Sequence, residues 1–155
     1  MDIFTFSSFK GGTAKTSTAL HIGASLSKFH NKKVLLIDFD SQANLSVGLD
    51  IGPDSLDTMV PVLQEKSSIQ EVIQKTNVEN LSLVAANAYL DGIEKTPELG
   101  NDPYAHELLR RALKDVRNDF DFCFIDTPPS LGWLTQSAFL HRNIVLSARF
   151  PKPIA

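Results

Sequence analysis

Near the start of the chain, the stretch FKGGTAKTS, residues 9–17, combines two adjacent glycines with two lysines and two hydroxyl side chains. Glycines let backbone N–H groups turn inward around an anion, lysine adds positive charge, and a threonine hydroxyl can bind Mg²⁺. The stretch therefore predicts a phosphate-binding loop, although Phe9 and Ala14 stand where the common G-x-x-x-x-G-K-[ST] pattern has glycine. A plain glycine-rich turn with solvated lysines is the alternative.

Two later apolar runs end in aspartate and could serve the same chemistry. LLIDFD ends with Asp38 and Asp40, and FCFIDTPPS contains Asp126. Nucleotide hydrolysis requires carboxylates that hold a metal's water shell and orient the attacking water. As an alternative, each aspartate is only a turn former or a helix cap, but a buried charge at a strand end is costly without a cation nearby.

The elements that must position these residues follow from the order of apolar patterns. Continuous apolar runs are typical of buried parallel strands, and we expect such strands at 2–8, 32–40, 81–86, 120–127 and 143–150. Helical spacing alternates with them, at 14–29, 69–75 and 103–117. Ser68 with Glu71 predicts a capping box, and Asp102 followed by Pro103 predicts a helix start. The expected fold is α/β, a mostly parallel sheet covered by helices on both faces, with ligands at the carboxyl ends of the strands.

Composition restricts the class of protein. The chain has 155 residues and a formal net charge of −3, which indicates one domain, residues 1–155, without an overall attraction to nucleic acid. Its single cysteine, Cys123, lies in an apolar run and predicts a buried thiol, and it excludes an intrachain disulfide or a CxxC metal site. We find no transmembrane segment, no membrane anchor and no signal peptide, and expect a cytoplasmic protein.

Three motifs together resemble the ParA/MinD family of deviant Walker ATPases. The family's loop has the form K-G-G-x-x-K-[ST], and it is matched by Lys10, Gly11, Gly12, Lys15 and Thr16. DFDSQAN resembles the family's second motif, D-x-D-P-Q-G-N, and IDTPPSLG resembles its Walker B and switch region. The resemblance implies a P-loop NTPase fold that binds ATP and Mg²⁺.

The resemblance also implies a role for each matching residue. Lys10 would reach the partner subunit's nucleotide in an ATP-dependent homodimer, Lys15 would hold the β- and γ-phosphates, and Asp40 would orient the attacking water. These three form the implied catalytic set. The implied nucleotide-binding residues are Lys10, Gly11, Gly12, Thr13, Ala14, Lys15, Thr16 and Ser17.

The implied metal site consists of Thr16, Asp38 and Asp126. The chain departs from the family pattern at Ala14, Ser17, Ser41 and Ala43, of which only Ala14 touches the phosphate loop. A methyl group at a helix start is tolerated where φ is negative, so we expect a negative φ at Ala14.

The motifs resemble ParA/Soj partition proteins more than MinD, which favours a partition ATPase in plasmid or chromosome segregation. In a full-length protein, the resemblance implies a ParB-like partner and non-specific DNA. A MinD-like cell-division ATPase and a non-catalytic, nucleotide-gated binding module are the alternatives. The basic cluster Arg110, Arg111, Lys114 and Arg117 is better explained as a solvated helix face than as a DNA-binding surface.

Members of this family continue through further strands and helices after the fifth strand. We therefore expect a domain that is incomplete at its C-terminal side, with weak ATPase activity in a chain of this length. The run 143–150 should flank the first strand as an edge strand and promote association between chains.

Overall fold

The computed structural model describes residues 1–8, 10, 12–52, 54–96, 104–130, 132–140 and 144–147. Four of the residues singled out in the sequence, Phe9, Gly11, Asp102 and Pro103, lie outside this part of the chain. The other residues of the phosphate-loop prediction and all three strand-end aspartates lie within it.

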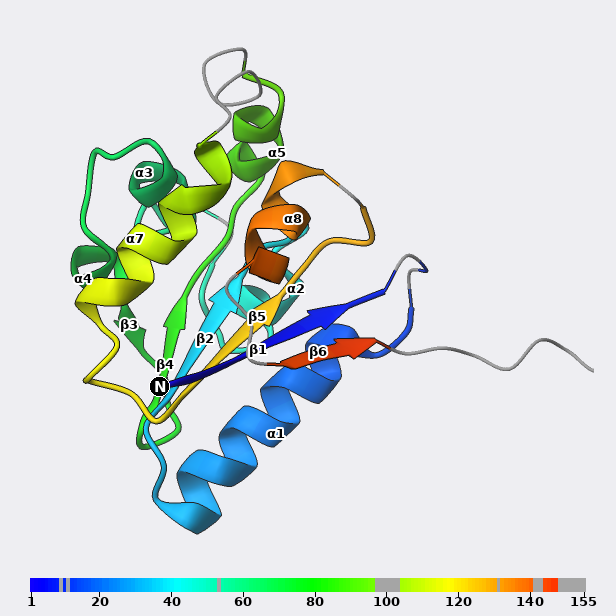
Figure 1. The fold of residues 1–155 in the computed structure, drawn as a ribbon. Coiled ribbons are helices and arrows are strands. Elements are labelled where there is room, and N and C mark those ends of the chain that lie inside the picture. Colours follow the sequence, from blue (N-terminus) through cyan, green and yellow to red (C-terminus); the bar gives the residue numbers. More distant parts are fainter. Residues whose placement is uncertain are drawn as a thin grey trace, which may run out of the picture.

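Six strands form one sheet in the order β3-β4-β2-β5-β1-β6 (Figure 1). The strands are β1 (Asp2–Ser7), β2 (Val34–Asp38), β3 (Gln74–Lys75), β4 (Leu81–Val84), β5 (Phe122–Asp126) and β6 (Ile144–Ser147). All neighbouring pairs are parallel except β3 with β4. The strand β6 pairs with β1 and ends the sheet in the part of the chain that is described, which confirms the expected position of the last apolar run.

Helices cover both faces of this sheet, as expected for its continuous apolar strands (Figure 1). One face carries α1 (Lys15–His30) and α2 (Asn44–Val47). The opposite face carries α3 (Met59–Leu63), α4 (Ile69–Val72), α5 (Tyr89–Glu94), α7 (Leu108–Asp115) and α8 (Trp133–Leu140), with a 3₁₀ turn, η1, at Ala105–Glu107. The predicted α/β class is therefore confirmed.

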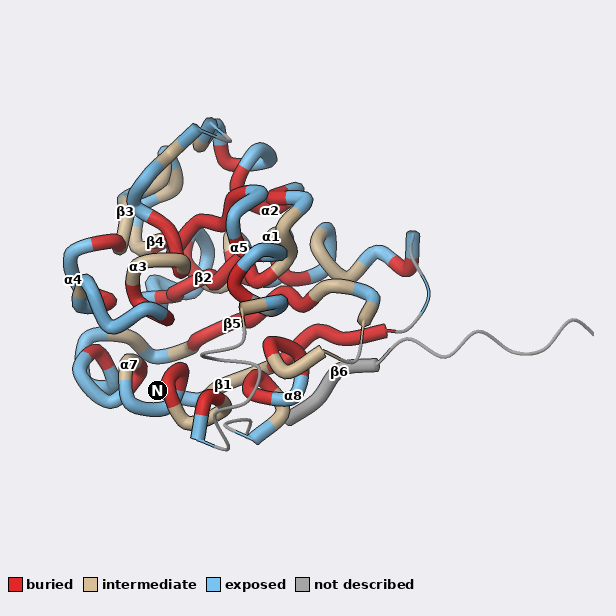
Figure 2. The backbone as a smooth tube through the Cα atoms, turned by 90° about the horizontal axis from the view of Figure 1, so that it is seen from above, coloured by how far each residue is buried: buried red, intermediate tan, exposed pale blue. Residues whose placement is uncertain are grey.

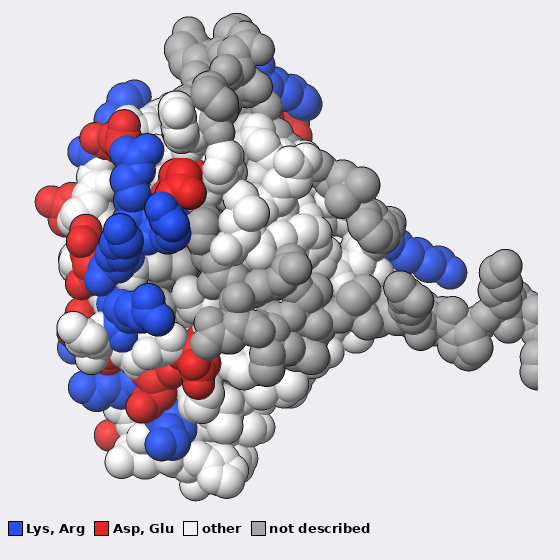
Figure 3. Space-filling view, in the orientation of Figure 1, with Lys and Arg blue, Asp and Glu red and all other residues white. Residues whose placement is uncertain are grey.

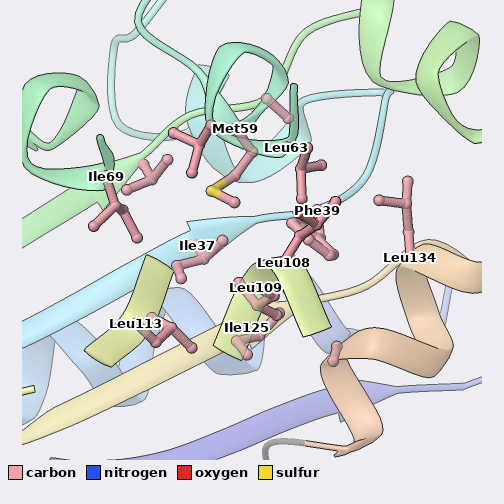
Figure 4. Close-up of a cluster of buried hydrophobic side chains, with 14 of the residues drawn as sticks. Ile37, Phe39, Met59, Leu63, Ile69, Leu108, Leu109, Leu113, Ile125 and Leu134 are labelled. Carbon is pink, nitrogen blue, oxygen red and sulfur yellow. The ribbon is translucent and has the colours of Figure 1, made fainter. Parts of the chain in front are cut away.

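The core consists of two apolar clusters, one on each face of the sheet. Because successive residues of a strand point to opposite faces, Leu35 and Ile37 of β2 join one cluster while Leu36 joins the other. The first cluster lies between the sheet and helices α3, α4, α7 and α8, where Figure 4 shows Ile37 and Ile125 facing Met59, Leu109 and their neighbours. The central strands are buried, whereas the outer helices carry most of the exposed residues (Figure 2).

A close approach brings α1 onto the second cluster. A Cβ atom added at Gly23 would lie 3.0 Å from the Leu36 side chain, so α1 packs closely here and a larger residue would force that side chain to shift. The rings of Phe4 and Phe6 pack edge-to-face on Phe124 there, each with its centroid 5.4 Å from that of Phe124. This packing holds α1 against the face of the sheet formed by β1, β2 and β5.

Two predicted helices are shorter in the structure. The Ser68–Glu71 capping box is present, but α4 ends at Val72 because Ile73 is extended and leads into the antiparallel strand β3. Consecutive β-branched residues favour this exit from the helix. The predicted helix 103–117 begins with η1 and is α-helical only over Leu108–Asp115.

The basic residues of α7 lie among acidic ones on the surface. Figure 3 shows Lys and Arg side chains over α4 and α7, interspersed with Asp and Glu. Arg111 forms a 3.1 Å ion pair with Glu65, and Arg110 pairs with Glu107. This mixture supports the interpretation of a solvated helix face.

Candidate functional site

The phosphate-loop prediction falls on the connection between β1 and α1, at the carboxyl edge of the sheet. The Lys10 N–H donates a hydrogen bond of 3.3 Å to the Ser8 hydroxyl, and Gly12 has a φ of +72°. Helix α1 begins at Lys15 with no side chain capping its N-terminus and no acidic residue in its first turn. The positive end of the helix dipole is therefore left for a ligand anion.

The backbone at Ala14 corrects one sequence-based expectation. Ala14 has φ 60° and ψ 20°, in the left-handed region, and not the negative φ expected for a tolerated alanine. Its carbonyl accepts both the N–H and the hydroxyl of Thr18, at 2.8 and 2.7 Å. The Cβ atom of Ala14 makes this conformation strained, whereas glycine, which has no Cβ, adopts it without a steric cost.

Thr16 and Asp126 meet across the base of the loop. The Thr16 hydroxyl donates a 2.6 Å hydrogen bond to Asp126 Oδ2, while Asp126 Oδ1 is buried without a hydrogen-bond partner among the described residues. Burial raises the pKa of Asp126 to about 7, with a smaller upward contribution from the charge of Asp38. The Thr16 hydrogen bond and the charge of Lys15 act in the opposite direction.

A buried, unpartnered carboxylate oxygen beside a threonine hydroxyl fits a bound metal ion. The described residues contain no cluster of three or more His, Cys, Asp or Glu side chains that could hold a metal by themselves. A metal ion here would take its remaining ligands from water or from a bound phosphate, which is how Mg²⁺ is usually held. Thr16 and Asp126 are the residues that would hold it.

Asp38 lies beside Asp126 because β2 and β5 are paired in register at these two residues. Its Oδ1 accepts the Asp40 N–H at 3.1 Å, and its Oδ2 accepts the N–H and the hydroxyl of Ser46 at 2.9 and 2.7 Å. Burial raises the pKa of Asp38 to about 6, although these hydrogen bonds pull it down. Both oxygens are thus engaged by the connection that follows β2.

Asp40 lies on that connection and is half-buried. Its Oδ1 accepts the Gln42 N–H at 3.0 Å, and its carbonyl accepts the Ala43 N–H at 2.9 Å, which makes a tight turn before α2. A cavity of about 710 Å³ separates this turn from the phosphate loop. The cavity is lined by Gly12, Thr13, Ala14, Lys15, Thr16, Ser17, Leu20, Asp40, Gln42, Asn44, Gly48 and Pro129.

The structure therefore brings loop residues 12–17 and Asp40 to one cavity, whereas Lys10 is not part of its lining. Asp126 is connected to the lining by its hydrogen bond with Thr16, and Asp38 is paired with Asp126 on the neighbouring strand. Sequence reasoning missed the apolar part of its lining, Leu20 and Pro129, and it also missed Ser46. The only signal for Ser46 was its place two residues after the second motif. Pro129 lies within the IDTPPSLG motif, but nothing in the sequence showed that it or Leu20 would line the cavity, because that depends on the tertiary fold.

Comparison with known sequences connects this geometry to described proteins. Residues 1–153 match the family described as an AAA domain. A ParA family protein of Chlamydia pneumoniae is 47% identical over 152 residues, which cover 98% of this chain and 60% of that protein. The chromosome-partitioning ATPase Soj of Treponema pallidum is 38% identical over 136 residues, covering 88% of this chain and 52% of Soj.

Comparison with solved structures gives the same fold. Cobyrinic acid a,c-diamide synthase from Mycobacterium smegmatis, solved with bound ADP and magnesium, superposes with a TM-score of 0.89 at 33% identity. The match covers 95% of this chain and 59% of that structure. The chain thus spans 52–60% of the length of these three proteins. None of the helices in the described residues is long and apolar enough to cross a membrane.

Proposed function

The chain belongs to the AAA-domain family that it matches over residues 1–153, among its ParA/MinD-type P-loop ATPases, and we propose that it binds and hydrolyses Mg-ATP. The observation that carries this proposal is the cavity that Lys15, Thr16 and Asp40 line together, with Asp126 hydrogen-bonded to Thr16 through one oxygen while its other oxygen is buried without a partner among the described residues. Proteins of similar sequence and fold include an ATPase and a structure with ADP and magnesium.

Each residue then has a defined task. The uncapped N-terminus of α1 and the N–H groups around Gly12 would surround the phosphates, and the Lys15 ammonium would neutralise the outer ones. Asp40 would orient the attacking water from the opposite wall of the cavity.

Magnesium would be held by Thr16 and Asp126, and it would neutralise charge on the phosphate oxygens. Asp38 would support the metal site from the neighbouring strand, since its own oxygens are occupied by Asp40 and Ser46. Mg²⁺ would also favour the charged form of Asp126, whose pKa burial raises in its absence.

As a biological role, we propose a ParA-type partition ATPase that acts in plasmid or chromosome segregation. Within it, Lys10 would reach the nucleotide of a second subunit in an ATP-dependent homodimer, and a ParB-like protein and non-specific DNA would be its partners. The sequence similarity to a chromosome-partitioning ATPase supports this role over a MinD-like one. A nucleotide-gated module without turnover is the second possibility, and it would bind ATP without releasing phosphate.

Calorimetric titration with Mg-ATP tests the proposal. Lys15→Ala should weaken binding roughly tenfold to a hundredfold, because charge-assisted hydrogen bonds to the phosphates are lost. Lys28→Ala is the matched control, since Lys28 is an exposed lysine near the other end of the same helix. Equal Mg-ATP affinity in the Lys15→Ala variant and the parent would disprove the assignment of the loop.

A further inference from the structure

We propose that Ser46 is a positioning residue, whose hydroxyl closes the loop that carries Asp40 and ties it to the end of β4. The inference rests on the proposed function, because Asp40 is the residue that the loop presents to the nucleotide. It concerns a side chain that lines no part of the cavity and that none of the three motifs assigns a role.

The hydroxyl of Ser46 connects three segments of the chain. It donates a 2.7 Å hydrogen bond to Asp38 Oδ2 and accepts a 3.1 Å hydrogen bond from the Ala86 N–H. Ser46, Asp38 and Ala86 are all completely buried, at 0% exposure. In this low-dielectric surrounding, each of the two hydrogen bonds is expensive to lose.

These contacts close the loop at its base. Asp38 stands at the end of β2 and Ser46 in α2, eight residues later, so their hydrogen bonds join the two ends of the connection. The other oxygen of Asp38 accepts the Asp40 N–H, which fixes the backbone of Asp40 to the same carboxylate. The position of Asp40 therefore depends on the orientation of Asp38, and the Ser46 hydroxyl helps to set that orientation.

The hydrogen bond between Ser46 and Ala86 fixes the loop relative to the sheet. Ala86 follows β4, the strand paired with β2 on the side away from β5. Without the Ser46 hydroxyl, the Ala86 N–H would be a buried donor without this partner, and Asp38 Oδ2 would keep only the Ser46 N–H. The phosphate loop is not part of this network, so the affinity for the nucleotide should change little when the Ser46 hydroxyl is removed.

Turnover and binding should therefore respond differently in a Ser46→Ala variant. We expect kcat to fall roughly tenfold to a hundredfold, because a small displacement of a reacting group has an effect of this size. The Mg-ATP dissociation constant should change less than about threefold, in keeping with a loop that remains in place. Ser137→Ala is the matched control, since the buried Ser137 hydroxyl donates a 2.7 Å hydrogen bond to Leu134 within α8.

Amide hydrogen exchange, followed by NMR on the protein without nucleotide, gives a readout independent of hydrolysis. Ser46→Ala should speed exchange at Asp40 and Ala86 by about tenfold or more, whereas Ser137→Ala should leave both unchanged. Should Ser46→Ala fail to fold, Ser46→Cys retains the side-chain volume with a weaker hydrogen bond and should shift the same two amides.

The outcomes separate this inference from the proposed function. Parental exchange rates at Asp40 and Ala86 in the Ser46 variants would overturn the positioning role, whatever the activity. An equal fall of kcat in Ser46→Ala and Ser137→Ala would also overturn it, because it would reflect general destabilisation. Failure of the parent to bind Mg-ATP would instead overturn the proposed function, and the exchange experiment would still decide the role of Ser46.

Discussion

Two connections lie at the carboxyl edge of the sheet, 8–14 after β1 and 39–43 after β2. They resemble each other in how they enter the next helix, but differ in how their polar groups are hydrogen-bonded. Each leads from a strand into a helix, and each places an alanine in the left-handed conformation directly before that helix. Ala14 has a φ of 60° and Ala43 a φ of 53°, and no side chain caps either helix.

The difference lies in how the polar groups are satisfied. Around the first connection, the Thr13 hydroxyl and Asp126 Oδ1 are buried without a hydrogen-bond partner in the described part of the chain. Around the second, Asp38 accepts three hydrogen bonds and the Ser46 hydroxyl takes part in two. Buried polar groups left unpaired usually have a functional reason. We therefore expect a ligand to satisfy the polar groups around the first connection, whereas those around the second are satisfied by the protein and hold the loop in place.

The largest expected effect is a loss of hydrolysis without a loss of nucleotide binding. Asp40→Ala should lower kcat by roughly 10²–10⁴-fold while Mg-ATP affinity stays close to that of the parent, because the phosphate contacts lie on the other connection. A phosphate-release assay, combined with calorimetry, measures both. Asp54→Ala, which removes an exposed aspartate outside the cavity lining, should change neither. Parental turnover in Asp40→Ala would remove the functional distinction between the two connections.

The second prediction concerns the pH dependence of the nucleotide-free protein. Folding raises the pKa of Asp126 to about 7 and that of Asp38 to about 6 from an ordinary 3.8, so the folded state binds protons more tightly than the unfolded state. The free energy of unfolding should therefore fall as the pH rises from about 4 to 7, by on the order of 3 kcal/mol for each group.

Urea denaturation at a series of pH values measures this slope. Asp126→Asn should flatten it mainly between pH 5 and 7, because the removed group titrates highest. A profile that is flat in the parent, or that keeps its slope in Asp126→Asn, would show that the unpartnered oxygen is not the origin of the effect.

The third prediction compares one polar group from each connection. Asp38→Asn should lower the free energy of unfolding by about 1–3 kcal/mol, because an amide cannot accept all three hydrogen bonds. Thr13→Val should change it by less than about 0.5 kcal/mol, since the Thr13 hydroxyl has no partner to lose. Denaturation at pH 5, where Asp38 is mostly neutral in the parent and the burial cost of its charge does not enter, tests the pair, and equal effects would contradict the comparison.

The smallest effects concern the two left-handed alanines. Ala14→Gly should stabilise the protein by about 1 kcal/mol, because glycine relieves the strain at an exposed position. Ala43→Gly should be close to neutral, because Ala43 is only 3% exposed and its methyl group packs in the core, where a lost methyl costs about 0.8 kcal/mol. Thermal unfolding of both variants checks the difference, and a destabilised Ala14→Gly would refute the strain.

Sequence reasoning located what depends on local pattern. The continuous apolar runs predicted the parallel strands. The glycine, lysine and hydroxyl residues after the first run predicted a phosphate loop, whose residues 12–17 line the cavity in the structure. The Ser68 capping box was readable because both of its partners lie within one helical turn.

What escaped prediction depends on contacts between distant segments. The left-handed Ala14 could not be read from its residue type, because alanine normally avoids that conformation. The Ser46 hydroxyl meets the Ala86 N–H only after β4 has paired with β2. The short strand β3 likewise exists only as the partner of β4, since two residues carry no periodicity of their own.

The pairing of β1 has a consequence for the order of folding. Both neighbours of β1 come from the far part of the chain: Phe4 is paired with Phe124 on one side and with Ile144 on the other. Closing loops of this length is entropically costly, and such distant pairs form slowly. During synthesis, β2 can pair with β4 while β1 waits for β5, so we expect the phosphate loop to be among the last segments to reach its native conformation. Substitutions in that loop should then change the rate of unfolding and leave the rate of folding nearly unaltered.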